Sequence, residues 1–135
     1  MATVQRFGDL LVWQKARVLS QFIYPLTFKK PIADDFRLRD QIRGSCGSIM
    51  DNIAEGFERG SRSEFINSLS ISKGEVGELK SQLYRSLDHN YITQEVFSKL
   101  YSLADELTKM ITAFINYLNR SAIRGQKFKN RPTNE

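Results

Sequence analysis

Apolar residues recur along this chain every three or four positions, which is the spacing of helices that bury one face. The four stripes are Val12, Ala16, Leu19 and Ile23; Leu38, Ile42, Cys46, Ile49, Ile53 and Phe57; Phe65, Leu69, Ser72, Val76, Leu79, Leu83 and Leu87; and Val96, Leu100, Leu103, Leu107, Met110, Phe114 and Tyr117. No segment sustains the alternation of a half-buried β-strand. The pattern therefore predicts an all-α protein with four helices.

The residues that flank the first two stripes predict where these helices begin and end. The first helix is expected over residues 9–24, with Asp9 as its N-cap and Pro25 as its stop. A linker with a second proline follows. The second helix is expected over residues 34–58, with one residue of an acidic pair at its start as N-cap and a glycine shortly after its end.

The boundaries of the last two helices are marked more clearly. Ser61-Arg62-Ser63-Glu64 has the form of a capping box, in which the serine and the glutamate each bond an unpaired backbone N–H. The third helix is expected to end at His89-Asn90, because asparagine accepts the left-handed conformation that terminates helices. Thr93 is expected to cap the fourth helix, which runs to about Arg120.

The short connections between these helices predict the topology. Neighbours joined by so few residues must run antiparallel, so we expect an up-down-up-down four-helix bundle formed by residues 1–120. Residues 121–135 are polar and basic, and they form an expected mobile C-terminal tail.

Two helices carry more apolar residues than one buried face requires. The first adds Leu11, Val18 and Phe22, and the fourth adds Phe97, Tyr101, Ala104, Ile111 and Ile115. Bundle helices usually keep one face for water, so the extra width predicts an interface between copies of the chain. We place Leu11, Val18, Phe22, Phe97, Tyr101, Ile111 and Ile115 in this interface. The alternative is that wide stripes fill the core around small residues on partner helices.

Small residues interrupt the two middle helices, with Gly44, Ser45, Gly47 and Ser48 in one and Ser70, Gly74, Gly77 and Ser81 in the other. A glycine inside a helix costs about 1 kcal/mol relative to alanine. Its repetition predicts a close approach of backbones, between these two helices or against a neighbouring subunit. A ligand groove is the alternative.

A polar stripe runs beside the apolar stripe of the second helix and consists of Gln41, Ser45, Ser48, Asn52 and Glu55. It is either a solvated flank or a buried or interfacial hydrogen-bond ladder of the kind that fixes helix register. The spacing alone does not decide between them.

The net charge of +5 is unevenly distributed. Residues 1–119 hold 15 Lys and Arg against 14 Asp and Glu, whereas residues 120–135 hold five against one. We expect nucleic-acid contacts near the start of the second helix and in the tail, at Arg37, Arg39, Arg43, Arg120, Arg124, Lys127, Lys129 and Arg131. The alternative for the first three is ordinary solvation and pairing with Asp35 and Asp40.

The residues that carry catalysis are scarce. His89 is the single histidine, Cys46 is the single cysteine, and the motifs of phosphate-binding loops, zinc sites and di-iron bundles do not occur. We therefore expect no enzyme activity, cofactor or metal. With one cysteine, no signal-peptide pattern and no apolar run of about 18 residues, we expect a cytoplasmic protein without membrane contact.

Several motifs together resemble one bacterial family. They are Phe7-Gly8-Asp9-Leu10, Val12-Trp13-Gln14-Lys15-Ala16-Arg17, Gln41-Ile42-Arg43, Ser48-Ile49, Asn52-Ile53-Ala54-Glu55-Gly56, Glu64-Phe65 with Leu69, Gly74, Glu78-Leu79 and Gln82-Leu83. Over roughly residues 7–118 the chain resembles the four-helix-bundle proteins of 23S rRNA intervening sequences. The family motif comprises Trp13, Gln41, Ser48, Asn52, Glu55, Gly56, Gly74 and Glu78. The chain departs from it at Met50-Asp51, where the family often has Pro-Ala, and at Glu75, where serine is commoner.

The resemblance implies a ring-shaped homo-oligomer, typically a homopentamer, without catalytic residues. It also implies kinship with the accessory variability determinants (Avd-like proteins) of diversity-generating retroelements, which bind a reverse transcriptase and nucleic acid through a basic surface. The leading hypothesis is a non-enzymatic oligomeric scaffold that contacts RNA or DNA. The alternative is an adaptor for a protein partner, such as a reverse transcriptase or other polymerase, without direct nucleic-acid binding.

Overall fold

Four α-helices make up most of the computed structural model, which describes residues 4–127. They are α1 (Leu11–Ile23), α2 (Phe36–Glu58), α3 (Arg62–Asp88) and α4 (Gln94–Lys127), and short 3-10 helices occupy Phe7–Asp9, Tyr24–Phe28 and Ile32–Asp34. This part of the chain contains no β-strand. The all-α prediction is confirmed.

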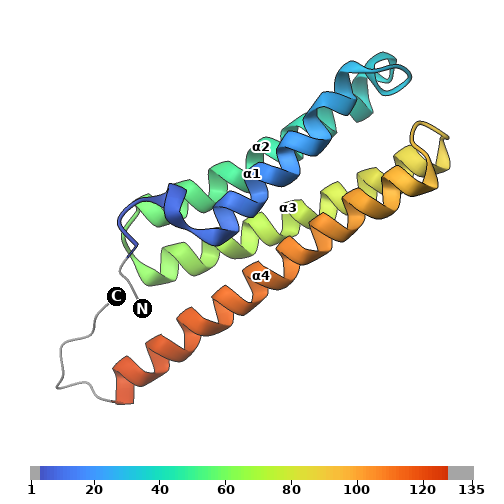
Figure 1. Ribbon diagram of the computed structural model, residues 1–135. Helices are drawn as coiled ribbons and strands as arrows, with labels where there is room; N and C mark the ends of the chain where they lie inside the picture. The colour runs from blue at the N-terminus through green and yellow to red at the C-terminus, as the bar shows by residue number, and fades with distance from the viewer. Residues whose placement is uncertain (1–3, 128–135) are drawn as a thin grey trace.

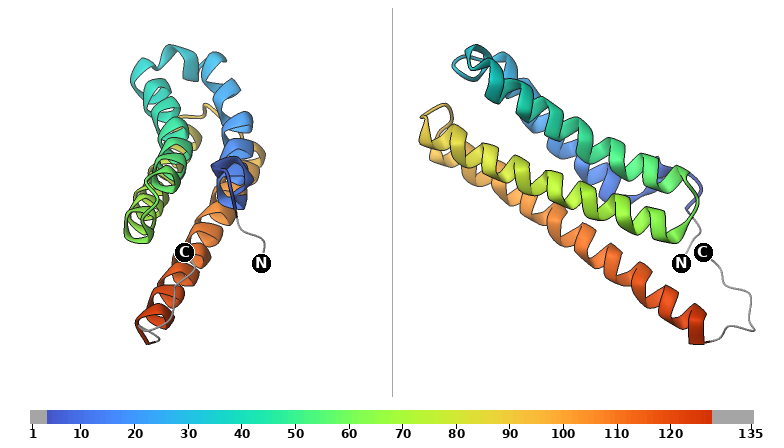
Figure 2. Two further views of the ribbon diagram at one scale, coloured as in Figure 1. Left: turned by 90° about the vertical axis from the view of Figure 1, so that its left-hand side faces the viewer. Right: turned by 180° about the vertical axis from the view of Figure 1, so that it is seen from behind.

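Helices that are consecutive in the sequence lie side by side. α1 packs on α2, α2 on α3 and α3 on α4, and α4 closes the arrangement by packing on α1. Neighbours run in opposite directions, so an α1–α2 hairpin lies over an α3–α4 hairpin as an up-down four-helix bundle (Figure 1). α4 diverges from the other helices toward its C-terminal end and projects beyond them (Figure 2).

Hydrogen bonds at the helix ends confirm most of the predicted caps. The backbone N–H of Leu38 donates to Asp35 Oδ1 over 3.2 Å, and that of Glu64 donates to Ser61 Oγ over 3.2 Å. The N–H of Val96 likewise donates to Thr93 Oγ1 over 3.2 Å. After α3, Asn90 adopts a φ of 61°, the left-handed conformation expected of a helix terminator.

Two predicted boundaries need correction. Asp9 does not cap α1, because it ends a 3-10 helix and α1 begins at Leu11 without a side-chain cap. α4 does not end near Arg120, because it continues to Lys127. No proline occurs in that stretch to stop the helix. The predicted division between bundle and tail at residue 120 therefore falls inside α4, and the rest of the predicted tail, residues 128–135, lies outside the described residues.

The core lies where the four helices meet, and the predicted stripes supply most of it. Leu38, Ile53, Leu69, Leu79 and Leu107 have no exposed surface. Each such burial contributes roughly 1.5–3 kcal/mol to folding, so the apolar stripes hold the bundle together. No helix in the described range is long and apolar enough to cross a bilayer.

The buried face of α4 differs from both stripes predicted for it. Its buried side chains are Phe97, Leu100, Ala104, Leu107 and Ile111, because the helix turns the border between the two stripes toward the core. Ile111 is 0% exposed and Phe97 is 8% exposed. The prediction that these two residues form an oligomer interface is wrong, since side chains buried in their own bundle offer no surface to a second copy.

Candidate nucleic-acid interface and interhelical groove

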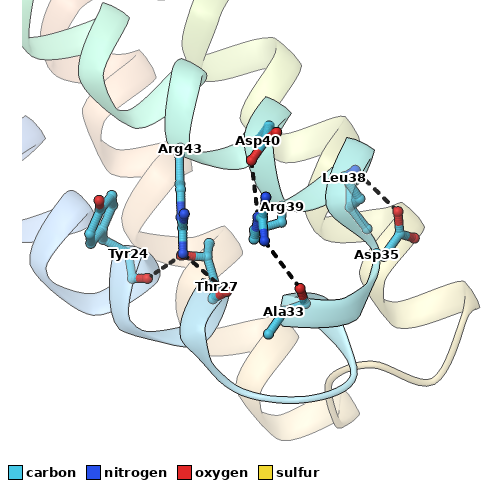
Figure 3. A network of polar contacts seen from close by, with 8 residues as sticks. All are labelled: Tyr24, Thr27, Ala33, Asp35, Leu38, Arg39, Asp40 and Arg43. Carbon is cyan, nitrogen blue, oxygen red and sulfur yellow. Dashed lines mark hydrogen bonds and ion pairs between the residues drawn. The ribbon is translucent and has the colours of Figure 1, made fainter.

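Arg43 holds the connection between α1 and α2 in place. Its Nε donates to Thr27 Oγ1 over 2.8 Å, and its Nη2 donates to the Thr27 carbonyl over 3.4 Å (Figure 3). The guanidinium also lies 4.2 Å from the ring centre of Phe28 and 5.5 Å from that of Tyr24. Thr27 is fully buried and donates in turn to the Tyr24 carbonyl. A predicted nucleic-acid contact is thus also a structural residue.

Arg39 is held by its surroundings in a similar way. Its Nε pairs with Asp40 Oδ1 at 3.0 Å, and its Nη1 donates to the Ala33 carbonyl over 3.4 Å (Figure 3). Its guanidinium lies 4.8 Å from the ring centre of Phe36. The predicted alternative of pairing with Asp40 is therefore confirmed for this arginine.

Arg37 differs from both, because it is exposed and has no hydrogen bond or ion pair with any residue that the structure describes. Exposed aromatic rings surround this end of the bundle, and Phe28 and Phe36 expose 62% and 65% of their surface. We define the basic-aromatic end as the exposed residues Tyr24, Phe28, Lys29, Phe36 and Arg37. Sequence reasoning missed its rings, although Phe28 and Phe36 fall outside every apolar stripe and flank basic residues.

The basic residues of α4 lie far from this end. Arg120 is exposed near the C-terminal end of α4, and Arg124 and Lys127 follow it in the last turns of the helix. This end of α4 lies opposite the α1–α2 connection (Figure 1). Within one chain, the two predicted groups of basic residues therefore lie at opposite ends of the bundle. Lys129 and Arg131 fall beyond the described residues.

The remaining residues of the predicted oligomer interface differ in exposure. Leu11, Val18 and Phe22 are exposed on α1. Tyr101 and Ile115 of α4 are half-buried and pack against the core, and Tyr101 also contacts Tyr84 at a ring-centre distance of 5.4 Å. The α1 residues thus form the accessible part of the predicted surface, which stays a prediction.

The polar stripe of α2 forms a ladder with α3 along part of its length. Gln41 Oε1 accepts from Arg85 Nη1 over 2.8 Å, and Ser45 Oγ accepts from Gln82 Nε2 over 3.0 Å. Farther along, Asn52 donates to the Ser48 carbonyl of its own helix. Interhelical bonding thus holds for the first part of the stripe.

The stripe ends at Glu55, which is exposed and pairs with Arg59 on the same helix. Glu55 therefore belongs to a solvated flank, whereas Gln41 and Ser45 belong to an interhelical hydrogen-bond ladder.

Among the glycines of α2 and α3, Gly56 alone requires a close approach of the two helices. A Cβ on Gly56 would lie 2.4 Å from Ser68 Cβ, so α2 and α3 touch there. A Cβ on any of the glycines Gly44, Gly47, Gly74 and Gly77 would meet nothing within 4 Å. For these four, the predicted close approach between α2 and α3 is wrong.

A groove with a volume of about 440 Å³ lies between α2 and α3. Its lining consists of Gln41, Gly44, Ser45, Ser48, Glu75, Glu78, Ser81, Gln82 and Arg85. Of the motif residues named above, Gln41, Ser48 and Glu78 therefore line the groove. Trp13 lies elsewhere, with its ring edge-on to Phe7 at 5.1 Å.

Cys46 and His89, the single cysteine and histidine, both occupy positions within the helical framework. Cys46 is buried, and this burial raises the pKa of its thiol to about 12, so the nucleophilic thiolate is scarce at neutral pH. His89 caps the C-terminal end of α3. Residues 4–127 contain no cluster of three or more His, Cys, Asp and Glu side chains that could hold a metal ion.

The chain is thus a small up-down helical bundle that has a basic-aromatic end and a polar groove between α2 and α3. The family model of the 23S rRNA-intervening sequence protein matches residues 8–113, and the chain belongs to this family.

One solved structure extends the comparison. It is the crystal structure of a protein with unknown function from the S23 ribosomal protein family from Bacteroides thetaiotaomicron VPI-5482. The similarity has a TM-score of 0.70 and 27% sequence identity, covering 78% of this chain and 98% of that one. No curated protein matches the chain significantly.

Proposed function

We propose that the protein is a non-enzymatic cytoplasmic scaffold that associates with copies of itself and binds RNA or DNA at the basic-aromatic end. The observation that carries this proposal is the exposure of Lys29 and Arg37 at the same end of the bundle as three exposed aromatic residues, Tyr24, Phe28 and Phe36. Cations on such a surface bind phosphates by releasing counterions, and exposed rings stack on unpaired bases. The buried single cysteine suits a reducing compartment.

Association of several copies would strengthen the binding of nucleic acid to this small surface. Leu11, Val18 and Phe22 present apolar surface on α1, which is the kind of face that copies of a chain cover in each other. In a ring, with five copies as the favoured number, the basic-aromatic ends are repeated around an axis. Repetition raises the effective concentration of each site toward the same strand, so weak single contacts add up to stable binding.

The proposal is tested by measuring the fluorescence anisotropy of labelled single-stranded RNA, single-stranded DNA and duplex DNA at increasing KCl concentration. The logarithm of the binding constant should fall linearly with the logarithm of salt concentration. Each phosphate contact that a variant removes should make this slope shallower by about one unit. Absent or salt-independent binding to all three nucleic acids would contradict the proposal.

Two paired variants separate the two ends of the bundle. The pair Lys29→Gln with Arg37→Gln should weaken binding and reduce the slope. The pair Arg124→Gln with Lys127→Gln tests the end of α4 in the same way. Arg59→Gln is the matched control, because Arg59 is an exposed arginine just past the far end of α2 that pairs with Glu55 at 3.3 Å. It should leave the slope unchanged.

Light scattering on the purified protein tests the association. A ring of five predicts a mass about five times the 15.6 kDa of one chain. Val18→Glu places a charge on the exposed apolar face of α1 and should reduce this mass. A wild-type mass of a single chain would contradict the oligomeric part of the proposal.

A second candidate function is an adaptor that binds a protein partner, such as a polymerase, and no nucleic acid. The exposed apolar face of α1 is the observation in its favour. Recovery of the same protein partner before and after nuclease treatment, together with an absence of nucleic-acid binding, would favour the adaptor.

A further inference from the structure

The interhelical groove contains a buried acceptor without a donor. Gln82 is 6% exposed, and its Nε2 donates to Ser45 Oγ over 3.0 Å. Its Oε1 is buried and has no hydrogen-bond partner among the described residues. A buried polar atom without a partner costs free energy, so in native proteins such atoms are usually satisfied by another protein group, an ordered water or a bound ligand.

Two carboxyl groups line the same groove and also lack a donor of opposite charge. Glu75 and Glu78 lie three residues apart on α3, close enough for their carboxyl groups to share a hydrogen bond. Burial and the neighbouring charge of Glu78 raise the pKa of Glu75. Among the side chains that the structure describes, neither carboxylate forms an ion pair with a lysine or arginine. A bound cation would reduce the electrostatic repulsion between these two carboxylates.

These acceptors are neighbours on one face of α3. Glu78 and Gln82 are four residues apart, which places their side chains about one helical turn from each other. The facing part of α2 leaves room, because a Cβ on Gly44 would meet no atom within 4 Å. The side chains of Glu75, Glu78 and Gln82 therefore line space that a ligand can enter.

Charge and geometry restrict what can bind there. An anion would be repelled by the two carboxylates, and the described residues offer no cluster of three or more metal-ligating side chains. Arg85, the cation of the groove, bonds Gln41 and lies seven residues from Glu78, or about 10 Å along the helix. We call the region of the groove around Glu75, Glu78 and Gln82 its acidic part. A ligand that suits this part carries a positive charge and several N–H donors.

We propose that the acidic part of the groove between α2 and α3 binds an ammonium or guanidinium group, with Glu75 and Glu78 pairing its charge and Gln82 Oε1 accepting one of its N–H groups. The shared chemistry has two sources, a free amine such as a polyamine and the side chain of a lysine or arginine in a protein partner. The proposal is independent of nucleic-acid binding, because it uses none of the residues of the basic-aromatic end.

The test is isothermal titration of the full-length protein with three probes: spermidine, L-arginine amide and a blocked peptide that contains one arginine. A peptide with glutamine in place of the arginine is the control probe. We expect saturable binding of at least one cationic probe and none of the glutamine peptide. Binding of the free amines indicates a small-molecule ligand, whereas binding of the arginine peptide alone indicates a protein side chain.

Two variants locate the site. Glu78→Gln removes one charge, and Gln82→Leu removes the unpaired acceptor while keeping a side chain of similar volume. Loss of a charged partner should weaken binding about tenfold or more, and loss of the neutral acceptor should have a smaller effect. Glu95→Gln, in the exposed first turn of α4, is the control and should not change the affinity.

Circular dichroism and thermal melting confirm that each variant folds. If no cationic probe binds saturably, or if Glu78→Gln and Gln82→Leu bind as tightly as the wild type, the proposal is overturned.

Discussion

α2 meets the rest of the molecule in two different ways. Its first turns contact the α1–α2 connection through long side chains, with Arg39 and Arg43 packed on aromatic rings and bonded to backbone carbonyls. Its side facing α3 carries small groups, which touch α3 where Gly56 meets Ser68 and line the groove at Gly44, Ser45 and Ser48. Long side chains fill the space at the first contact, whereas the small residues at the second leave part of it open as a groove. The same helix therefore supplies a rigid basic end and an open polar flank.

The largest effect is expected from removing the arginine that holds the first contact. Arg43→Ala deletes two hydrogen bonds to Thr27 and two ring contacts, and it leaves the buried Thr27 carbonyl without this donor. We expect a loss of roughly 3 kcal/mol in the free energy of unfolding, measured by urea denaturation. Arg37→Ala, six residues earlier on the same helix, should change this free energy by less than about 0.5 kcal/mol. Equal stability of the two variants would show that Arg43 is not structural.

A smaller loss is expected where α2 touches α3. Gly56→Ala places a Cβ 2.4 Å from Ser68 Cβ, so the two helices must move apart or the serine must shift. Overpacking of this kind costs roughly 1–3 kcal/mol, and we expect a loss of about 2 kcal/mol on urea denaturation. Pairing it with Ser68→Gly should recover part of the loss, because the clashing atom is then absent. Failure of that second change to restore stability would contradict a direct contact.

The groove side of α2 should respond in the opposite direction. Gly44→Ala adds a Cβ that meets nothing within 4 Å, and alanine favours a helix over glycine by up to about 1 kcal/mol. The free energy of unfolding should therefore rise by roughly that amount. A loss instead would indicate that the groove narrows in solution and that its glycines are needed for packing.

The smallest effect is a pH dependence at the start of α2. Hydrogen bonds from the Leu38 backbone and from Tyr91 lower the pKa of Asp35 below its usual value of 3.8. A carboxyl whose folded pKa is lowered stabilises the protein above the unfolded pKa, and this contribution is lost as the pH falls through the folded value. Asp35→Asn keeps a capping side chain without the charge, so its Tm should depend less on pH between about 5 and 2 than that of the wild type. Identical pH profiles would contradict this role.

The parts of the fold that depend on near neighbours could be predicted from the sequence. Ser61, Thr93 and Asn90 act on backbone groups within a few residues, so their roles follow from local chemistry. The buried stripes of α1 and α2 follow from helical periodicity in the same way. Periodicity does not identify the buried face of α4, because that helix is apolar over a wide arc and packing determines which part of the arc is buried.

The parts of the candidate site that depend on distant partners could not be predicted. Arg43 bonds Thr27, which is 16 residues away across a connection whose path the sequence does not reveal. The unpaired Gln82 oxygen exists only because α2 lies antiparallel to α3 in one register. The spacing of the polar stripe allowed a ladder or a solvated flank, and contacts with α3 decide where each occurs.

The most direct test of the central claim is a map of backbone amide chemical shifts in the full-length protein during titration with a short single-stranded oligonucleotide. If the basic-aromatic end binds nucleic acid, the perturbed amides should lie mainly within residues 24–43. The turn between α2 and α3 at residues 59–61, at the opposite end of the bundle (Figure 1), should stay unchanged. Perturbations confined to that opposite end, or none at saturating oligonucleotide, would contradict the claim.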